Sequence, residues 1–212
     1  MKRTISVLGA GAWGTALALT AARAGHNVRL WARDTGTVSS INNNRQNPHY
    51  LPGVTLDLPV NATSDLKVAL QAASLVLAVV PAQSLQACLL QAKAHIPVGI
   101  PLVLCAKGIE KTTGRLMSEM ARQTLAQNPI AVLSGPSFAL DVARGLPTAV
   151  TIAADNADLA ANVLGELRPD AVDVGQRHEH ALVGRNVHTG DTSHSLLSFV
   201  SSRAALAAPC PS

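Results

Sequence analysis

The sequence predicts a protein of the α/β class, built on a doubly wound and mostly parallel sheet. Strand-like apolar runs alternate with helix-like segments from the N-terminus to about residue 167, and such alternation is typical of parallel sheets. The runs are aliphatic, because the 212 residues include only two Phe, two Trp and one Tyr. Strands rich in aliphatic residues suit a sheet that helices cover on both faces.

The expected elements follow one another in a regular order. Gly25 is placed to end the first helix, Ser64 or Asp65 can cap the second regular helix, and Asn156 can cap the last. Prolines between residues 48 and 59 indicate that 35–59 holds a helix and then an irregular loop. The expected strands are 4–8, 27–32, 74–80, 101–106, 130–134 and 148–153, and the other expected helices are 13–24, 65–72, 84–94, 113–126, 137–144 and 157–167.

A glycine-rich turn joins the first expected strand to the first expected helix. The segment Gly9-Ala10-Gly11-Ala12-Trp13-Gly14 has the G-x-G-x-x-G spacing. In dinucleotide-binding units the first glycine permits the tight turn, the second lets the backbone approach a pyrophosphate, and the third allows close packing of helix on strand. The N-terminus of the helix offers unpaired N–H groups to the anion. The motif therefore predicts a dinucleotide site, with an ordinary strand-to-helix turn as the alternative.

Composition and charge argue against several other classes of protein. The formal net charge is +4, but the basic residues are dispersed and few aromatics interleave them, which favours small anionic ligands over nucleic acid. Cys88, Cys105 and Cys210 show no C-x-x-C spacing, so we expect neither a disulfide framework nor a zinc site. Apolar runs such as 75–81 are too short to span a bilayer and no signal-peptide pattern is present, so we expect a cytoplasmic protein.

The end of the second expected strand bears on the choice of nucleotide. An acidic residue there binds the 2′-hydroxyl of NAD and repels the 2′-phosphate of NADP. Ala32 occupies this position, and the following Arg33 can pair with a 2′-phosphate. Asp34 comes two positions late and can simply cap the next turn. The pattern favours NADP(H), while use of both nucleotides, or a plain surface role for Arg33, stays open.

Two further strand ends carry residues suited to an anionic substrate, at the edge where open α/β sheets bind ligands. Lys107 follows the expected strand 101–106, and its cation can meet a phosphate or carbonyl oxygen or simply be solvated. Gly135, Pro136 and Ser137 follow the next strand. There Pro136 can take the first helical position and Ser137 offers a hydroxyl and an N–H, although a capped turn is the alternative.

Taken together, these stretches resemble bacterial-type NAD(P)-dependent glycerol-3-phosphate dehydrogenases. The resemblance runs from residue 1 to about 167, with Asp141 where the family usually has Glu. The matching stretches are 7–16, 30–34, 50–52, 78–81, 106–110, 133–139 and 147–150.

The resemblance implies a Rossmann-like fold and reduction of dihydroxyacetone phosphate to sn-glycerol 3-phosphate with NAD(P)H, a step in phospholipid synthesis. It implies a small phosphorylated three-carbon substrate, and a homodimer where the full family domain is present. Besides the motif glycines Gly9, Gly11 and Gly14, it assigns cofactor contacts to Ala12, Trp13, Arg33, Tyr50, Lys107 and Ala139, and substrate contacts to Lys107, Gly135 and Ser137.

Residues 168–212 depart from the family pattern. In the family, a Gly-Gly-x-x-Lys-Asn stretch with the catalytic lysine follows, and then an all-helical domain, whereas this sequence has no lysine after Lys111. No catalytic residue is therefore assigned, and a catalytically silent NADP(H)-binding module is the alternative function. The expected organisation is a dinucleotide-binding domain over 1–167 and a divergent tail over 168–212, which a shifted reading frame or an early end would explain.

The tail itself has little periodicity. A short helix fits only 196–206. His178 and His180 have a spacing that could ligate a metal, but no third and fourth ligand follow at zinc-like spacing, so no metal site is expected.

Overall fold

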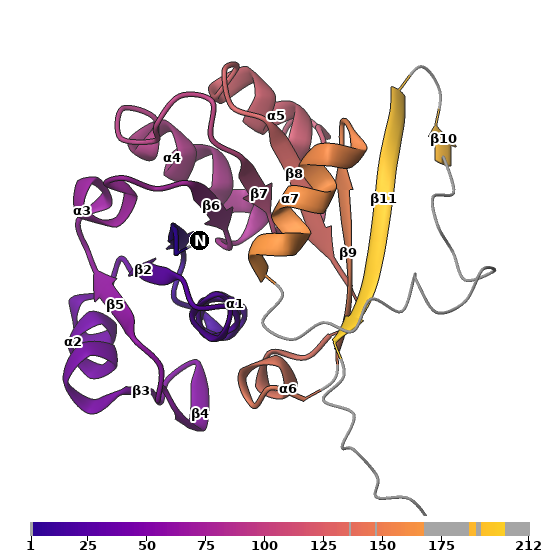
Figure 1. The fold of residues 1–212 in the computed structure, drawn as a ribbon. Helices are drawn as coiled ribbons and strands as arrows, with labels where there is room; N and C mark the ends of the chain where they lie inside the picture. The colour runs from indigo at the N-terminus through magenta and orange to yellow at the C-terminus, as the bar shows by residue number, and fades with distance from the viewer. Residues whose placement is uncertain (1, 136, 147, 168–186, 190–191, 202–212) are drawn as a thin grey trace, which may run out of the picture.

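A central β-sheet organises the molecule (Figure 1). The computed structural model describes residues 2–135, 137–146, 148–167, 187–189 and 192–201. The strands of the sheet are β1 (Thr4–Leu8), β2 (Asn27–Trp31), β5 (Val60–Thr63), β6 (Leu75–Ala78), β7 (Leu102–Leu104), β8 (Ile130–Ser134), β9 (Thr148–Ala154), β10 (Val187–Thr189) and β11 (Thr192–Ser201). Across the described residues their order is β10-β11-β9-β8-β7-β6-β1-β2-β5.

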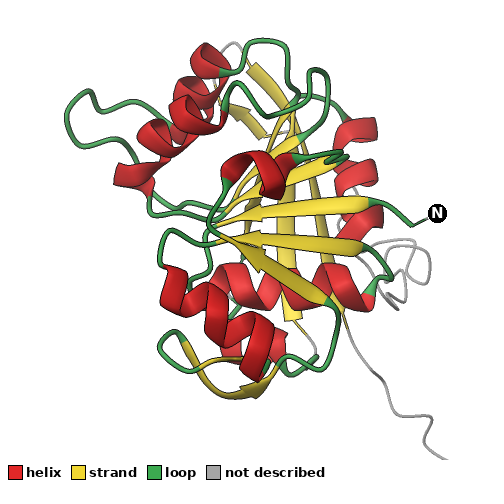
Figure 2. Cartoon of the chain, turned by 90° about the vertical axis from the view of Figure 1, so that its left-hand side faces the viewer, coloured by secondary structure: helices red, strands yellow, loops and turns green. Residues whose placement is uncertain are grey.

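Strand direction confirms the predicted mostly parallel sheet. From β8 through β7, β6, β1 and β2 to β5, each strand is parallel to the next. The strand β9 runs antiparallel to β8, and β11 runs antiparallel to β9. Since the parallel strands share a direction, their carboxyl ends meet at one edge of the sheet, opposite the N-terminus in Figure 2.

Helices cover both faces of this sheet. They are α1 (Ala12–Arg23), α2 (Thr35–Asn44), α3 (Leu66–Leu70), α4 (Ala82–Ala92), α5 (Met117–Thr124), α6 (Ala139–Ala143) and α7 (Ala157–Leu167). One buried cluster joins α1, α2, α6 and α7 to one face, and a second joins α3, α4 and α5 to the other. Alternate strand residues serve the two clusters: Leu75 and Leu77 of β6 face one, and Val76 and Ala78 face the other. Burial on both faces explains the uninterrupted aliphatic runs.

Several predicted boundaries and elements were wrong. Residues 35–59 form α2 and then a hairpin of β3 (Gln46–Asn47) and β4 (Leu51–Thr55), and the strand β5 was not predicted at all. The fifth helix begins at Met117, not 113, because the Glu110 carboxylate accepts hydrogen bonds from the N–H groups of Thr112 and Thr113 and holds a turn there.

The expectation of a helix over 196–206 was also wrong where the structure describes it. Residues Thr192–Ser201 are the strand β11, which pairs with β9 from Ser195 to Ser201. An open sheet edge offers unpaired N–H and C=O groups, and pairing with them stabilises an extended segment whose apolar spacing alone also fits a helix. His178, His180, Cys210 and the predicted helix start at Pro136 lie outside the described residues.

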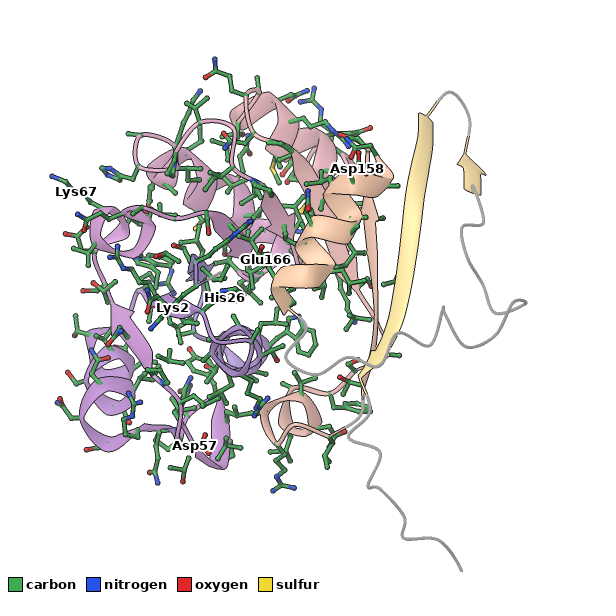
Figure 3. All side chains as sticks on the ribbon, in the orientation of Figure 1. Lys2, His26, Asp57, Lys67, Asp158 and Glu166 are labelled. Atoms are coloured by element: carbon green, nitrogen blue, oxygen red, sulfur yellow. The ribbon has the colours of Figure 1, made fainter. Side chains whose placement is uncertain are left out.

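Arg3, His26 and Glu166 contact one another at the end of the sheet where the parallel strands begin. Glu166 near the end of α7 lies beside the buried His26 (Figure 3), with Oε2 3.3 Å from Nε2 of that residue. Its Oε1 lies 2.8 Å from Nη1 of Arg3. The N–H of Arg3 donates to Nδ1 of His26. These contacts join α7, β1 and the α1–β2 connection at the end of the sheet opposite the strand carboxyl ends.

Candidate dinucleotide-binding site

A cavity lies where the chain changes direction across the sheet. From β1 the chain passes to β2 on one side and later returns to β6 on the other, so the connections after β1 and β6 diverge. Ligands of open α/β sheets bind at such a point. A cavity of about 850 Å³ opens there, and its lining includes the glycine-rich turn, the end of β2 and the start of α4. That volume is within the range typical of small-molecule sites.

The three motif glycines have different surroundings. Gly9 has φ +114°, and a Cβ there would lie 2.8 Å from the carbonyl oxygen of Val79. A Cβ on Gly14 would overlap the carbonyl oxygen of Gly9, whereas one on Gly11 would meet nothing within 4 Å. Gly9 and Gly14 are thus required by packing. The space at Gly11 is left free at the cavity wall, as the approach of a pyrophosphate requires.

The N-terminus of α1 lines the cavity next to Gly11. Gly11 is the N-cap and, as a glycine, it makes no side-chain cap hydrogen bond. As at the start of any α-helix, the first N–H groups have no carbonyl partner within the helix, and the helix dipole adds partial positive charge. The first turn of α1 carries no acidic residue, and Ala12 and Trp13 line the cavity. This end of α1 is suited to an anion.

The end of β2 contributes an arginine and an aspartate with different roles. Arg33 is exposed and lines the cavity. The Asp34 carboxylate accepts hydrogen bonds from the N–H of Thr37 at 2.6 Å and from its hydroxyl at 2.7 Å. These bonds, led by that from the hydroxyl, hold the pKa of Asp34 below its usual value. The expectation that Asp34 caps the next turn is confirmed, and the guanidinium of Arg33 is the cation that this strand end presents.

One wall of the cavity was missed by sequence reasoning. Ser84, Ala87, Cys88 and Gln91 of α4 line it. Their spacing of three, one and three residues places them on one helical face, and α4 directly follows the carboxyl end of β6. A helix face in that position is a signal that could have identified them.

The two cysteines of this site, Cys88 and Cys105, are expected to be unreactive at neutral pH. Burial raises the pKa of Cys88 to about 11 and that of Cys105 to about 12. Both line the cavity. At neutral pH these thiols stay protonated, so they act as apolar lining and not as nucleophiles.

The predicted substrate residues lie beside the cavity. The ammonium of Lys107, which lines the cavity, donates to the carbonyl oxygen of Gly135 at 3.3 Å. A Cβ on Gly135 would lie 2.6 Å from the carbonyl oxygen of Ala149, so β8 and β9 approach closely there. The Ser137 hydroxyl donates to the same oxygen of Ala149 at 2.6 Å. The helix α6 begins at Ala139 and not at 137, since this hydroxyl bonds to β9 and does not cap the helix.

The structure therefore brings most of the predicted residues together. Gly135, Ser137 and Ala139 are not among the described residues that line the cavity. Those that do line it are Gly9, Gly11, Ala12, Trp13, Gly14, Arg33, Tyr50 and Lys107.

The described ranges hold neither a cluster of metal ligands nor a helix that could span a membrane. No group of three or more His, Cys, Asp or Glu side chains in these ranges gathers to hold a metal ion. None of the helices within them is long and apolar enough to cross a membrane.

A doubly wound sheet with a G-x-G-x-x-G turn at its switch point defines the Rossmann class of nucleotide-binding domains. Residues 4–160 match the family model described as the N-terminus of NAD-dependent glycerol-3-phosphate dehydrogenase. The chain belongs to this family.

Known relatives agree with that membership. The chain is 62% identical over 164 residues to a glycerol-3-phosphate dehydrogenase [NAD(P)+] of Chelativorans sp. (strain BNC1), covering 77% of this chain and 50% of the relative. It is 60% identical over 159 residues to the enzyme of that name from Mesorhizobium japonicum, covering 75% of this chain and 46% of the relative. The crystal structure of glycerol-3-phosphate dehydrogenase from Coxiella burnetii matches with a TM-score of 0.74 and 37% identity, over 79% of this chain and 51% of that one. The chain spans about half the length of these relatives.

Proposed function

We propose that residues 1–167 form the NAD(P)H-binding domain of an oxidoreductase that reduces dihydroxyacetone phosphate to sn-glycerol 3-phosphate, a precursor of glycerophospholipids. The observation that carries the proposal is the open space at Gly11, next to the uncapped N-terminus of α1, in a chain of the glycerol-3-phosphate dehydrogenase family.

The residues around this space fit a dinucleotide. We assign the pyrophosphate to the N–H groups at the start of α1, from Gly11 to Trp13. N–H groups at a helix N-terminus point out of the helix and stabilise a bound anion. Tyr50 and Lys107 lie on the cavity lining, available to the rest of the cofactor. When bound, the reduced nicotinamide supplies the hydride that adds to the substrate carbonyl carbon.

We propose NADPH as the favoured cofactor. Arg33 lines the cavity and has an exposed guanidinium, which can pair bidentately with a 2′-phosphate. The neighbouring Asp34 uses Oδ2 for both bonds to Thr37, so its carboxylate is directed to α2. At this strand end the cation of Arg33 is available to the nucleotide, while the carboxylate of Asp34 is bonded to α2. This arrangement favours NADPH, which carries more negative charge than NADH.

The substrate is assigned to the edge formed by Lys107, Gly135 and Ser137. The Lys107 ammonium can neutralise charge on a phosphate or stabilise a carbonyl oxygen that gains charge during reduction. Lys107 lines the cavity and also contacts Gly135 in the turn after β8. The Ser137 hydroxyl donates to Ala149, and its oxygen lone pairs remain for a second partner.

A second candidate function is NADP(H) binding without turnover. The sequence has no lysine after Lys111, although the family resemblance assigns the proton donor to a lysine in a later stretch. General acid catalysis typically contributes about 10²- to 10⁴-fold to a rate. We therefore expect residues 1–212 by themselves to bind NADPH and to reduce dihydroxyacetone phosphate very slowly.

One pair of measurements shows whether residues 1–212 by themselves bind the cofactor only or also catalyse the reaction. NADPH binding to residues 1–212 is measured by titration, and NADPH oxidation is followed by absorbance with dihydroxyacetone phosphate present. Binding with negligible oxidation supports the silent module for this polypeptide. Oxidation in the usual enzyme range of about 1 to 10³ per second supports full catalysis and shows that another residue supplies the proton. Failure to bind NADPH would contradict both functions.

Location and assembly stay predictions. A cytoplasmic location is tested by cell fractionation, and a homodimer of a full-length family member is tested by sedimentation.

A further inference from the structure

A buried amide lies beneath the glycine-rich turn. Asn47, on β3, is 1% exposed. Its Nδ2 donates to the carbonyl oxygen of Ala10 at 2.8 Å and to the hydroxyl oxygen of Thr15 at 2.8 Å. The Thr15 hydroxyl in turn donates to the same Ala10 oxygen at 3.5 Å. One side chain from a separate hairpin thus ties the turn to the first helical turn of α1.

These bonds fix the direction of one peptide group. Because the peptide between Ala10 and Gly11 is planar and trans, its C=O and N–H point in opposite directions. The carbonyl oxygen of Ala10 points to Asn47, so the N–H of Gly11 points away from Asn47. Gly11 lines the cavity, and Asn47 is not among the described lining residues. A rotation of this peptide would replace the N–H with a carbonyl oxygen, which repels an anion.

The same residue also fixes a second part of the wall. The N–H of Tyr50 donates to the main-chain oxygen of Asn47 at 3.3 Å. Tyr50 lines the cavity. The Asn47 side chain thus holds the Ala10–Gly11 peptide, and the Asn47 main chain bonds to a second residue of the cavity wall.

We propose that Asn47, acting with Thr15, is a positioning residue for the pyrophosphate of the bound dinucleotide. It holds the Ala10 carbonyl away from the ligand and keeps the Gly11 N–H directed to it. The inference rests on the proposed NADPH site.

The test compares two ligands on the Asn47→Asp variant. This substitution keeps the side-chain shape but replaces the donor with an acceptor that faces the Ala10 oxygen. NADPH contains the pyrophosphate, and adenosine 2′-monophosphate does not. We expect Asn47→Asp to raise the Kd of NADPH by about 10-fold or more, in line with the loss of a buried hydrogen bond, and to change the Kd of adenosine 2′-monophosphate by less than about 2-fold.

A matched control lies on the preceding helix. The amide of Asn42 donates to the main-chain oxygen of Ala62 at 2.9 Å and accepts from its N–H at 2.8 Å, and Asn42 is outside the described cavity lining. Asn42→Asp should lower the melting temperature and leave both Kd values unchanged. The Asn42→Asp variant therefore shows the effect of losing a side-chain bond to the backbone when the Ala10–Gly11 peptide is undisturbed.

A second variant keeps the test valid if Asn47→Asp does not fold. Thr15→Val removes the hydroxyl that Asn47 contacts, and Thr15→Ser restores a hydroxyl, so NADPH affinity should fall in the first variant and recover in the second. Equal weakening of both ligands, or an unchanged NADPH Kd in folded Asn47→Asp, would overturn the inference. If the unmodified protein binds neither adenosine 2′-monophosphate nor NADPH, the proposed function itself fails.

Discussion

A Cβ atom on Gly14 would overlap the carbonyl oxygen of Gly9, which shows how closely α1 approaches the end of β1. At Gly11 the equivalent atom would meet nothing within 4 Å. Two of the three motif glycines are therefore fixed by the fold itself, and the third is free for a ligand. This difference separates the effects that substitutions at the three positions should have.

Gly11→Val should abolish NADPH binding and lower the free energy of unfolding by only about 1 kcal/mol, because the extended backbone at this N-cap accepts a side chain although Val is a poorer N-cap than Gly. Gly14→Ala should destabilise the protein by about 1–3 kcal/mol through overpacking. Urea unfolding and NADPH titration measure the two effects.

A control for these variants lies in α7. Gly165 is exposed within the helix, and a Cβ there meets nothing within 4 Å. Gly165→Ala should therefore stabilise the protein by up to about 1 kcal/mol and leave NADPH binding unchanged. A folded Gly11→Val protein with normal NADPH affinity would place the nucleotide elsewhere.

Arg33→Asp should change nucleotide preference. Loss of a charge-assisted pair with the 2′-phosphate, and gain of a like charge, should weaken NADPH binding at least about 10-fold more than NADH binding. Arg29→Ala is the control, because the Arg29 guanidinium donates to the main-chain oxygens of Val68 and Gln71 and supports α3. Equal losses of both nucleotides in Arg33→Asp would remove the basis for NADPH preference.

Cys88 and Cys105 should react slowly with thiol reagents in the folded protein. Burial raises the pKa of these thiols to about 11 and about 12, so almost no thiolate is present at pH 8. A Cys210→Ser variant lets the reaction report these two residues alone, and urea should make both react fast. Rapid labelling of either thiol without urea would show that this cavity wall opens to solvent.

Glu110 should titrate at unusually low pH. The N–H of Thr112, followed by the hydroxyl and N–H of Thr113, lowers its pKa from 4.5 to about 2. Because the pKa of the folded state is depressed, the carboxylate stabilises this turn fully above about pH 4.5 and loses that effect as the pH falls toward 2. NMR titration of the Glu110 carboxyl measures this, and Thr113→Val should move the midpoint upward. A midpoint near 4.5 in the unmodified protein would mean that the turn is not formed.

Features set by neighbouring residues were predictable from the sequence. Asp34, Asp65 and Asn156 cap helices at the expected positions, since a cap needs only a polar side chain within a few residues of the helix start. The glycine motif was recognisable for the same reason: all its requirements lie within six residues and their two flanking elements.

Features set by distant contacts were not predictable. The segment Val60–Thr63 is too short and polar to predict a strand, and it is extended because it pairs with β2. The apolar spacing after residue 196 fits a helix, but pairing with β9 makes Leu196–Ser201 a strand. Asn47 is of a residue type that is common in loops. The role we propose for it depends on Ala10, 37 residues away, and nothing in the local sequence indicates that contact.

The two tryptophans give the most direct test of the nucleotide site. Trp13 and Trp31 are the only tryptophans in the sequence, and both line the cavity. Reduced nicotinamide absorbs at the wavelengths where tryptophan emits. Titration of NADPH into residues 1–212 should therefore cause a saturable loss of tryptophan emission with a matching rise in nicotinamide emission, and Gly11→Val should show neither change. The absence of a saturable change in the unmodified protein would contradict the assignment of this cavity as a dinucleotide site.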